Sequence, residues 1–170
     1  MTLKEKIKND SITARKNKKE IEYSTLNYLL ALILNKEKEK RFKIIKKENS
    51  VEDIEKKSQL TDDEIIDLIL SEIKKRKESL EFFQKEKRDE LVKKEEEELK
   101  ILEKYIPQQL TDNEIEEIVK EVIDKNKIDS LKDMGKIMGN VMPKIKGRAD
   151  GSKVNNIVKK IILEKINKPE

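Results

Sequence analysis

The residues with the clearest chemical potential lie in the stretch from Pro143 to Lys153, which is PKIKGRADGSK in one-letter code. Its two glycines favour a turn, and Asp150 or Ser152 is placed to cap a following helix. Free N–H groups at a helix N-terminus, surrounded by basic side chains, favour the binding of a phosphate group. The order of residues is not that of a Walker loop. The stretch therefore predicts a phosphate-contacting basic turn, continued along the following helix and made of Lys144, Lys146, Gly147, Arg148, Asp150, Gly151, Lys153, Lys159 and Lys160.

The charge around this turn is uneven. Residues 143–168 hold eight basic and two acidic side chains, a local charge of +6, whereas residues 111–133 hold four basic and eight acidic ones, or −4. The whole chain has a net charge of only +4, so attraction to a polyanion has to come from such clustering. From charge alone, nucleic-acid contact and a merely solvated basic face both remain open.

A second candidate is a stripe of methionines and glycines at helical spacing. Methionines recur every four residues beside two glycines, which places soft side chains next to a face that another backbone can approach. This pattern predicts a partner-binding face made of Met134, Gly135, Met138 and Gly139. The alternative is core packing, because a small helical unit needs every large apolar side chain it has.

Other chemistry has little support in the sequence. The chain contains no Cys and no His, which removes disulfides, thiolate or imidazole zinc sites, the Ser-His-Asp triad and thiol nucleophiles. Carboxylates are abundant at Glu95–Glu98, but nearby lysines are at pairing distance and no apolar pocket is evident to shift their pKa values. We therefore expect no enzymatic activity of the chain by itself, no catalytic residues, no bound metal and no cofactor.

The elements that have to position these residues are helices. Charged residues make up 45% of the 170 residues and aromatic ones 4%, a balance that favours thin, solvated helices over a sandwich or barrel. Apolar residues at a period of 3.6 predict helices from Leu3 to Ala14 and from Tyr23 to Leu34, then a solvated helix extension and loop over 36–58. The pair Thr61 and Glu64 forms a capping box ahead of a helix to about Gln84, and a fourth helix carries apolar residues from Leu91 to Ile106.

The distribution of Gly and Pro divides the chain. Residues 1–106 contain neither, and Pro107 stops the fourth helix before a capping box of Thr111 and Glu114 starts another. Short helices follow over 131–142, ended by Pro143, and over the apolar positions from Val154 to Ile162. We therefore predict an all-α protein with an N-terminal helical hairpin bundle (1–106), a linker (107–110) and a three-helix C-terminal bundle (111–170).

Three stretches resemble the GatB/YqeY family, free-standing relatives of the tail of the B subunit of glutamine-dependent aspartyl/glutamyl-tRNA amidotransferase. They are KKRKESLEFF (74–83), ELKILEKYIPQQLTDNEIEEIV (98–119) and KDMGKIMGNVMPKIKGRADGSKVNNIVKKIIL (132–163). The resemblance covers nearly the whole chain and is specific from about 72 to 164. The chain departs from the family in having Asn27 where members commonly have an Arg, and in a longer charged connector at 36–58.

The resemblance implies an all-helical, two-part fold whose C-terminal part acts like the tail of the B subunit, which cradles the body of a tRNA. We expect tRNA as a partner, contacted by shape because stacking aromatics are nearly absent, and association with a tRNA-modifying or aminoacylation complex. A protein-protein adaptor that uses the Met and Gly face is one alternative, and a glutamine-dependent amidotransferase (carbon-nitrogen ligase) is another, which rests on family association alone. The charged N-terminus and an apolar run of only Leu29–Leu34 predict a cytoplasmic protein without a signal peptide or membrane segment. We expect it to be a monomer.

Overall fold

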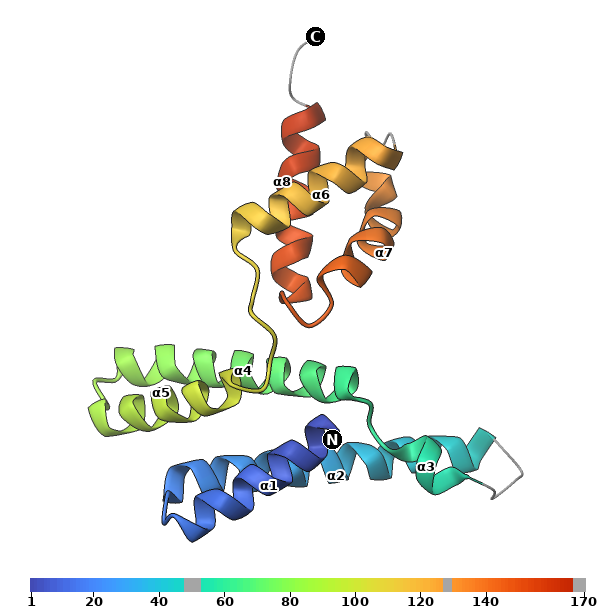
Figure 1. Ribbon diagram of the computed structural model, residues 1–170. Coiled ribbons are helices and arrows are strands. Elements are labelled where there is room, and N and C mark those ends of the chain that lie inside the picture. Colours follow the sequence, from blue (N-terminus) through green and yellow to red (C-terminus); the bar gives the residue numbers. More distant parts are fainter. Residues whose placement is uncertain (48–52, 127–129, 167–170) are drawn as a thin grey trace. The chain divides into compact units, whose positions relative to one another are not determined.

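The computed structural model describes residues 1–47, 53–126 and 130–166, and its regular elements over these residues are all helices (Figure 1). The predicted all-α fold is confirmed. The chain divides into two compact units, the N-terminal unit Met1–Ile106 and the C-terminal unit Pro107–Glu170, each with its own hydrophobic core. Residues 48–52 of the predicted connector lie outside the described residues, as do Lys127, Asp129 and Lys168, which enter the charge counts.

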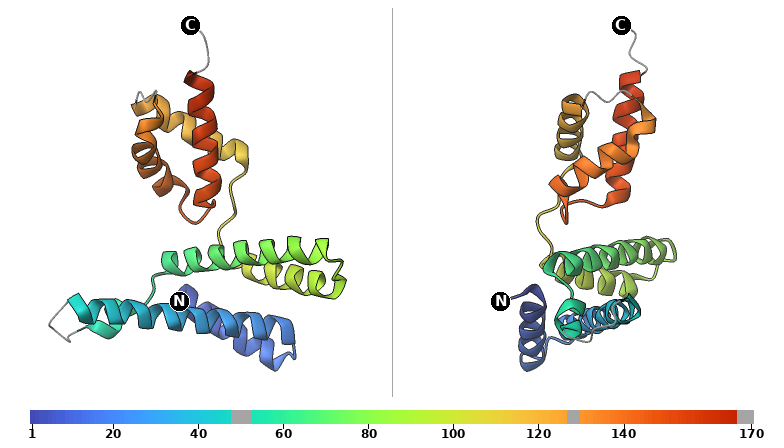
Figure 2. Two further views of the ribbon diagram at one scale, coloured as in Figure 1. Left: turned by 180° about the vertical axis from the view of Figure 1, so that it is seen from behind. Right: turned by 90° about the vertical axis from the view of Figure 1, so that its right-hand side faces the viewer.

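The N-terminal unit consists of two antiparallel helical hairpins and a short connecting helix (Figures 1 and 2). The hairpins pair α1 with α2 and α4 with α5, and α2 also packs on α5. Fully buried side chains from these helices form one core, among them Ile7, Leu26, Ile33, Ile65 and Ile69. The helices are α1 (Leu3–Lys16), α2 (Glu20–Lys47), α3 (Ile54–Ser58), α4 (Asp62–Lys85) and α5 (Asp89–Glu103).

Lysines stand at the turns of both hairpins, at positions where glycine is common. Lys18 between α1 and α2 has a φ of 55°, and Lys87 between α4 and α5 has a φ of 54°. A left-handed residue with a side chain costs about 1–2 kcal/mol relative to glycine. The two hairpin turns therefore form without a glycine, which explains why the sequence carries no local signal for them.

Both predicted capping boxes form, at Thr61 with Glu64 and at Thr111 with Glu114. The Thr61 hydroxyl accepts a hydrogen bond from the Glu64 backbone N–H, and the Glu64 carboxylate accepts one from the Thr61 N–H at 2.8 Å. Thr2 and Glu5 repeat the arrangement at α1. The hydrogen bond from Lys40 at 2.8 Å is the main reason that the pKa of Glu64 is lowered. The predicted extension of α2 continues as helix to Lys47, and part of the predicted loop is the helix α3.

The C-terminal unit packs three α-helices around one core. Its elements are α6 (Asp112–Asn126), the 3-10 turn η1 (Leu131–Asp133), α7 (Met134–Ile145) and α8 (Gly151–Ile166). The prediction that Pro143 ends α7 is wrong, because the helix continues to Ile145 with the proline in its last turn. Proline has the φ of a helix, and in a last turn on an exposed face its missing N–H removes one backbone hydrogen bond only.

Over the described ranges, no helix is both long enough and apolar enough to span a lipid bilayer.

Candidate nucleic-acid interface

The predicted basic turn connects α7 to α8. Gly147 is buried and has a φ of 72°, which only glycine adopts without strain. The Arg148 N–H donates to the Ile145 carbonyl at 2.8 Å and closes the turn. The Asp150 carboxylate accepts from the Ser152 N–H at 3.0 Å, and its carbonyl accepts from the Val154 N–H at 3.0 Å. Of the two residues that the sequence offers as the cap of α8, the structure uses Asp150.

The predicted linker packs on this turn. The Leu110 N–H donates to the Arg148 carbonyl at 2.7 Å, and the Gln109 amide donates to the Gly147 carbonyl at 2.9 Å. In return, Arg148 Nε donates to the Gln108 carbonyl at 3.3 Å, and the Leu110 side chain is buried in the core of the C-terminal unit. The PQQL and KGRADG strings are therefore two halves of one structural element, and two carbonyls of the turn are occupied within the chain.

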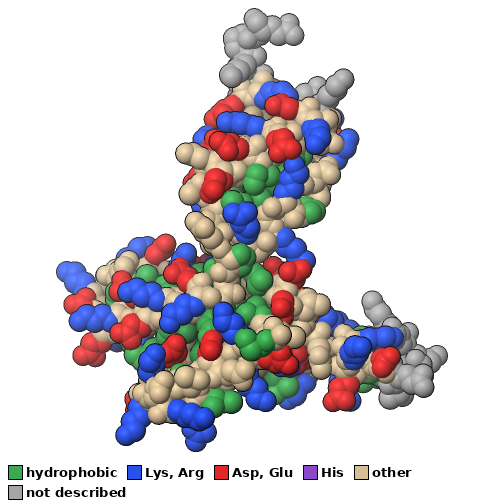
Figure 3. Space-filling model, viewed as in Figure 1, with side chains coloured by type: hydrophobic (Ala, Val, Ile, Leu, Met, Phe, Trp, Pro, Cys, Tyr) green, Lys and Arg blue, Asp and Glu red, His purple; other side chains and the backbone are tan. Residues whose placement is uncertain are grey.

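Most of the predicted phosphate-binding lysines lie beside carboxylates of α6. Lys144 pairs with Glu121 at 3.1 Å, Lys160 pairs with Glu116 at 3.3 Å, and Lys153 pairs with Asp112. The hydrogen bond with Lys144 lowers the pKa of Glu121, and the bond with Glu116 raises the pKa of Lys160. The two charge clusters thus interleave across the helices, and red and blue side chains mix over the visible face of this unit (Figure 3).

The remaining basic residues of the prediction are also exposed. Lys146, Arg148 and Lys159 present their side chains to solvent, and Gly151 is the first residue of α8. The predicted basic side chains are therefore all exposed on the C-terminal unit, and carboxylates of α6 lie among them. Surface ion pairs of the kind seen at Lys144, Lys153 and Lys160 contribute only about 0–1 kcal/mol, so exchanging a carboxylate for a phosphate costs little.

The predicted Met and Gly face divides into two parts. Met134 and Met138 are half-buried and pack against the core of the C-terminal unit. Gly135 and Gly139 are exposed, and a Cβ atom added to either would meet no atom within 4 Å beyond its chain neighbours and the backbone of its own helix. The methionines therefore contribute to the unit's own core, whereas its internal packing gives no reason for the two glycines.

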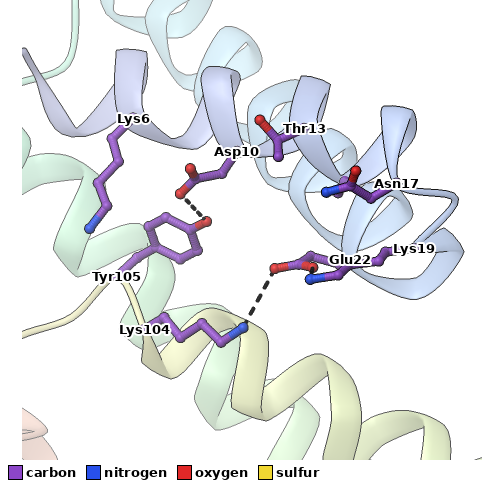
Figure 4. Close-up of a pocket in the computed structure, with 9 residues that line it drawn as sticks. Lys6, Asp10, Thr13, Asn17, Lys19, Glu22, Lys104 and Tyr105 are labelled. Atoms are coloured by element: carbon purple, nitrogen blue, oxygen red, sulfur yellow. Dashed lines mark hydrogen bonds and ion pairs between the residues drawn. The ribbon is translucent and has the colours of Figure 1, made fainter.

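The N-terminal unit holds a polar cluster that sequence reasoning missed (Figure 4). It lines a cavity of about 250 Å³, with Asp10 and Tyr105 pointing toward one another. The Tyr105 hydroxyl donates to Asp10 at 2.7 Å, and the Lys6 ammonium lies 5.6 Å from the centre of the Tyr105 ring. Glu22 lies between Lys19 at 3.1 Å and Lys104 at 3.5 Å, and these bonds lower its pKa. Tyr105 and Asp10 are 95 positions apart in the sequence, so no local sequence pattern indicates the hydrogen bond between them.

Tyr105→Phe is expected to destabilise the protein by about 1–3 kcal/mol at neutral pH, because Asp10 loses a hydrogen-bond donor. Burial, followed by the bond to Asp10, raises the pKa of Tyr105 above that of an unfolded tyrosine, about 10. The stabilisation is therefore complete below about pH 10 and is lost as the pH rises further, because only the unfolded tyrosine then ionises.

Urea unfolding between pH 7 and 11 measures this effect. The difference in unfolding free energy between wild type and Tyr105→Phe should shrink above pH 10. Tyr28→Phe is the matched control, because the Tyr28 ring is half exposed. A difference that stays constant over this pH range would contradict the role given to the hydroxyl.

Comparison with known proteins adds the following similarities. The sequence model of the family described as "Yqey-like protein" matches residues 38–162. A stretch of 60 residues, 32% of this chain, is 42% identical to 9% of the E subunit of the glutamyl-tRNA(Gln) amidotransferase from Thermococcus sibiricus. A stretch of 105 residues, 60% of the chain, is 34% identical to 58% of "Altered inheritance of mitochondria protein 41, mitochondrial" from Pyrenophora tritici-repentis. The chain thus spans less than two thirds of either relative. The first relative is an E subunit, whereas the sequence motifs resemble the tail of a B subunit.

Proposed function

The chain belongs to the Yqey-like protein family, and from this premise we propose that it is a tRNA-binding module that associates with a tRNA-dependent amidotransferase. Its C-terminal unit contacts RNA phosphates through the basic turn and the start of α8. The chain itself supplies no catalytic residue, and the proposed contact depends on the shape and charge of the tRNA.

Two observations together support the proposal: similarity to a subunit named for a tRNA substrate, and exposed basic residues at the turn between α7 and α8. The relative from Thermococcus sibiricus is named for an enzyme that acts on glutamyl-tRNA(Gln), which indicates a tRNA-related complex. Residues 108–110 hydrogen-bond to the turn that would meet the RNA and hold its backbone from one side. Lys146 and Arg148 are therefore presented on a backbone that is already ordered before RNA binds, which lowers the backbone entropy cost of binding.

Binding of unfractionated tRNA at several salt concentrations tests the proposal. Affinity should fall linearly on a log-log plot as salt rises, because each phosphate contact releases counterions. The double variant Lys146→Glu, Arg148→Glu should bind at least about tenfold more weakly at low salt, with a slope shallower by roughly two contacts. Its melting temperature should fall only slightly, because exposed charges contribute little to stability and the hydrogen bond from Arg148 Nε to the Gln108 carbonyl is long and exposed.

The matched control is Lys120→Glu with Lys125→Glu, an equal charge change at two exposed positions of α6 in the same unit. Equal losses in both double variants would mean general attraction to polyanions, and unchanged binding in the turn variant would exclude this site. If tRNA does not bind and a protein partner binds without salt dependence, the adaptor alternative through Met134, Gly135, Met138 and Gly139 is favoured instead.

A further inference from the structure

A groove between α1 and α2 in the N-terminal unit combines exposed apolar side chains with basic side chains, and the packing of the unit does not account for this combination. Its volume is about 630 Å³. Five of its lining residues come from α1 and three come from α2, and they are Lys8, Ser11, Ile12, Arg15, Lys16, Tyr23, Asn27 and Leu30. The positions on α1 follow the spacing i, i+3, i+4, i+7 and i+8, so they form one continuous face of the helix.

The floor of this groove is apolar and partly open. Ile12 keeps 46% of its surface exposed although it lies in the middle of α1, and Leu30 and Tyr23 are half-buried beside it. The distance along α1 from Lys8 to Lys16 is about 12 Å at the rise of an α-helix. This length matches two turns of a helix laid along the groove.

The rim of the groove is positively charged. Lys8, Arg15 and Lys16 are exposed basic residues, and none of the described residues that line the groove is acidic. The two carboxylates of α1 interact elsewhere: Asp10 accepts the Tyr105 hydroxyl, and Glu5 belongs to the capping box with Thr2. The charge of this face is therefore not balanced by the helix that carries it.

These features favour a protein segment over a nucleic acid. The groove has one aromatic ring, Tyr23, and the Arg15 guanidinium already lies 5.8 Å from its centre, over one face. Stacking of bases depends on open aromatic faces, whereas exposed Ile12 and Leu30 suit apolar anchors. We propose that this groove binds an amphipathic helix of a partner protein, with apolar residues in the groove and Asp or Glu residues along the basic rim. This inference is independent of the proposed RNA contact, which concerns the other unit.

The experiment uses the full-length chain and a synthetic peptide as the probe. The peptide is a labelled 16-residue helix with Leu at every third or fourth position and Glu beside them. We expect saturable binding by fluorescence anisotropy, with amide shifts in ¹⁵N NMR spectra confined to residues 8–16 and 23–30. The same peptide with its residues scrambled, or with Glu replaced by Lys, should bind at least tenfold more weakly.

Two double variants give the decisive comparison. Arg15→Glu with Lys16→Glu should lose at least tenfold in affinity for the peptide. Lys38→Glu with Lys43→Glu makes the same charge change at exposed positions of α2 outside the groove, and it should bind like wild type. Ile12→Asp should abolish binding while circular dichroism shows an unchanged helix content, because Ile12 is exposed.

The opposite outcomes overturn the inference. They are no saturable binding of the acidic peptide, amide shifts outside the groove, or equal losses in both double variants. Preferential binding of a single-stranded RNA oligonucleotide at residues 8–16 would assign the groove to nucleic acid. None of these results depends on whether the C-terminal unit binds tRNA, so the two proposals fail separately.

Discussion

Leu110→Ala is expected to lower the free energy of unfolding of the C-terminal unit by about 2–5 kcal/mol, the usual cost of a buried leucine. The sequence predicts this residue in a linker, where such a change would cost almost nothing. In the structure its side chain lies in a core with Ile115, Ile145 and Ala149, and its N–H bonds to the Arg148 carbonyl. A unit of this size has little stability to spare, so the loss is a large fraction of the total.

Hydrogen exchange on the full chain measures the loss of stability separately for each unit, because it reports on individual backbone amides. Amides of α6, α7 and α8 should exchange faster in Leu110→Ala, while amides of α1, α2, α4 and α5 keep their protection. This pattern also tests whether the two units, each with its own core, unfold independently. Leu163→Ala is the control, because this leucine of α8 is 45% exposed and its truncation should cost less than about 1 kcal/mol.

Two results would contradict the prediction. Equal amide protection of α6, α7 and α8 in Leu110→Ala and wild type would mean that residues 107–110 act only as a linker. Loss of protection in both units together would mean that the chain unfolds as one cooperative body.

The sequence predicts the helices well and the contacts between them poorly. Periodic apolar residues and the capping boxes at Thr61 and Thr111 mark helix starts, because both signals lie within a few residues. The turns at Lys18 and Lys87 carry no such signal, since their left-handed residues are not glycines. Pro143 gives a misleading signal, because a proline in a last helical turn is tolerated.

In the candidate site, too, local features could be predicted from the sequence, whereas contacts between distant residues could not. The turn at Gly147 and the cap at Asp150 are local features, and both could be predicted. The bond between Gln109 and Gly147 joins residues 38 positions apart, and the pair of Lys160 and Glu116 joins residues 44 positions apart. Charge counts along the chain therefore predict a polarised unit, whereas folding places the opposite charges side by side.

Arg76→Leu is expected to destabilise the N-terminal unit strongly, by about 3–5 kcal/mol. Arg76 of α4 has only 16% of its side chain exposed and donates to Glu98 and, at 3.1 Å, to Glu95 of α5. The Tyr28 ring centre lies 6.0 Å from its guanidinium carbon. Removing the arginine leaves Glu98, which is only 7% exposed, without its cationic partner. The cost comes from this buried carboxylate more than from the lost attraction.

A double-mutant cycle separates these two causes. Arg76→Leu with Glu98→Leu removes more native groups than Arg76→Leu alone, yet it should be more stable than the single variant. The buried carboxylate of Glu98 is gone, and of the two carboxylates that Arg76 contacts only the more exposed Glu95 remains without it. Urea unfolding followed by circular dichroism gives both values. Lys36→Leu is the control, since its pair with Glu39 is more than half exposed on both sides and should contribute less than about 1 kcal/mol. A double variant as unstable as the sum of its single changes would show that the two residues act independently. The cost of Arg76→Leu would then come from the packing of its own side chain, which is only 16% exposed, and not from its pairing with Glu98.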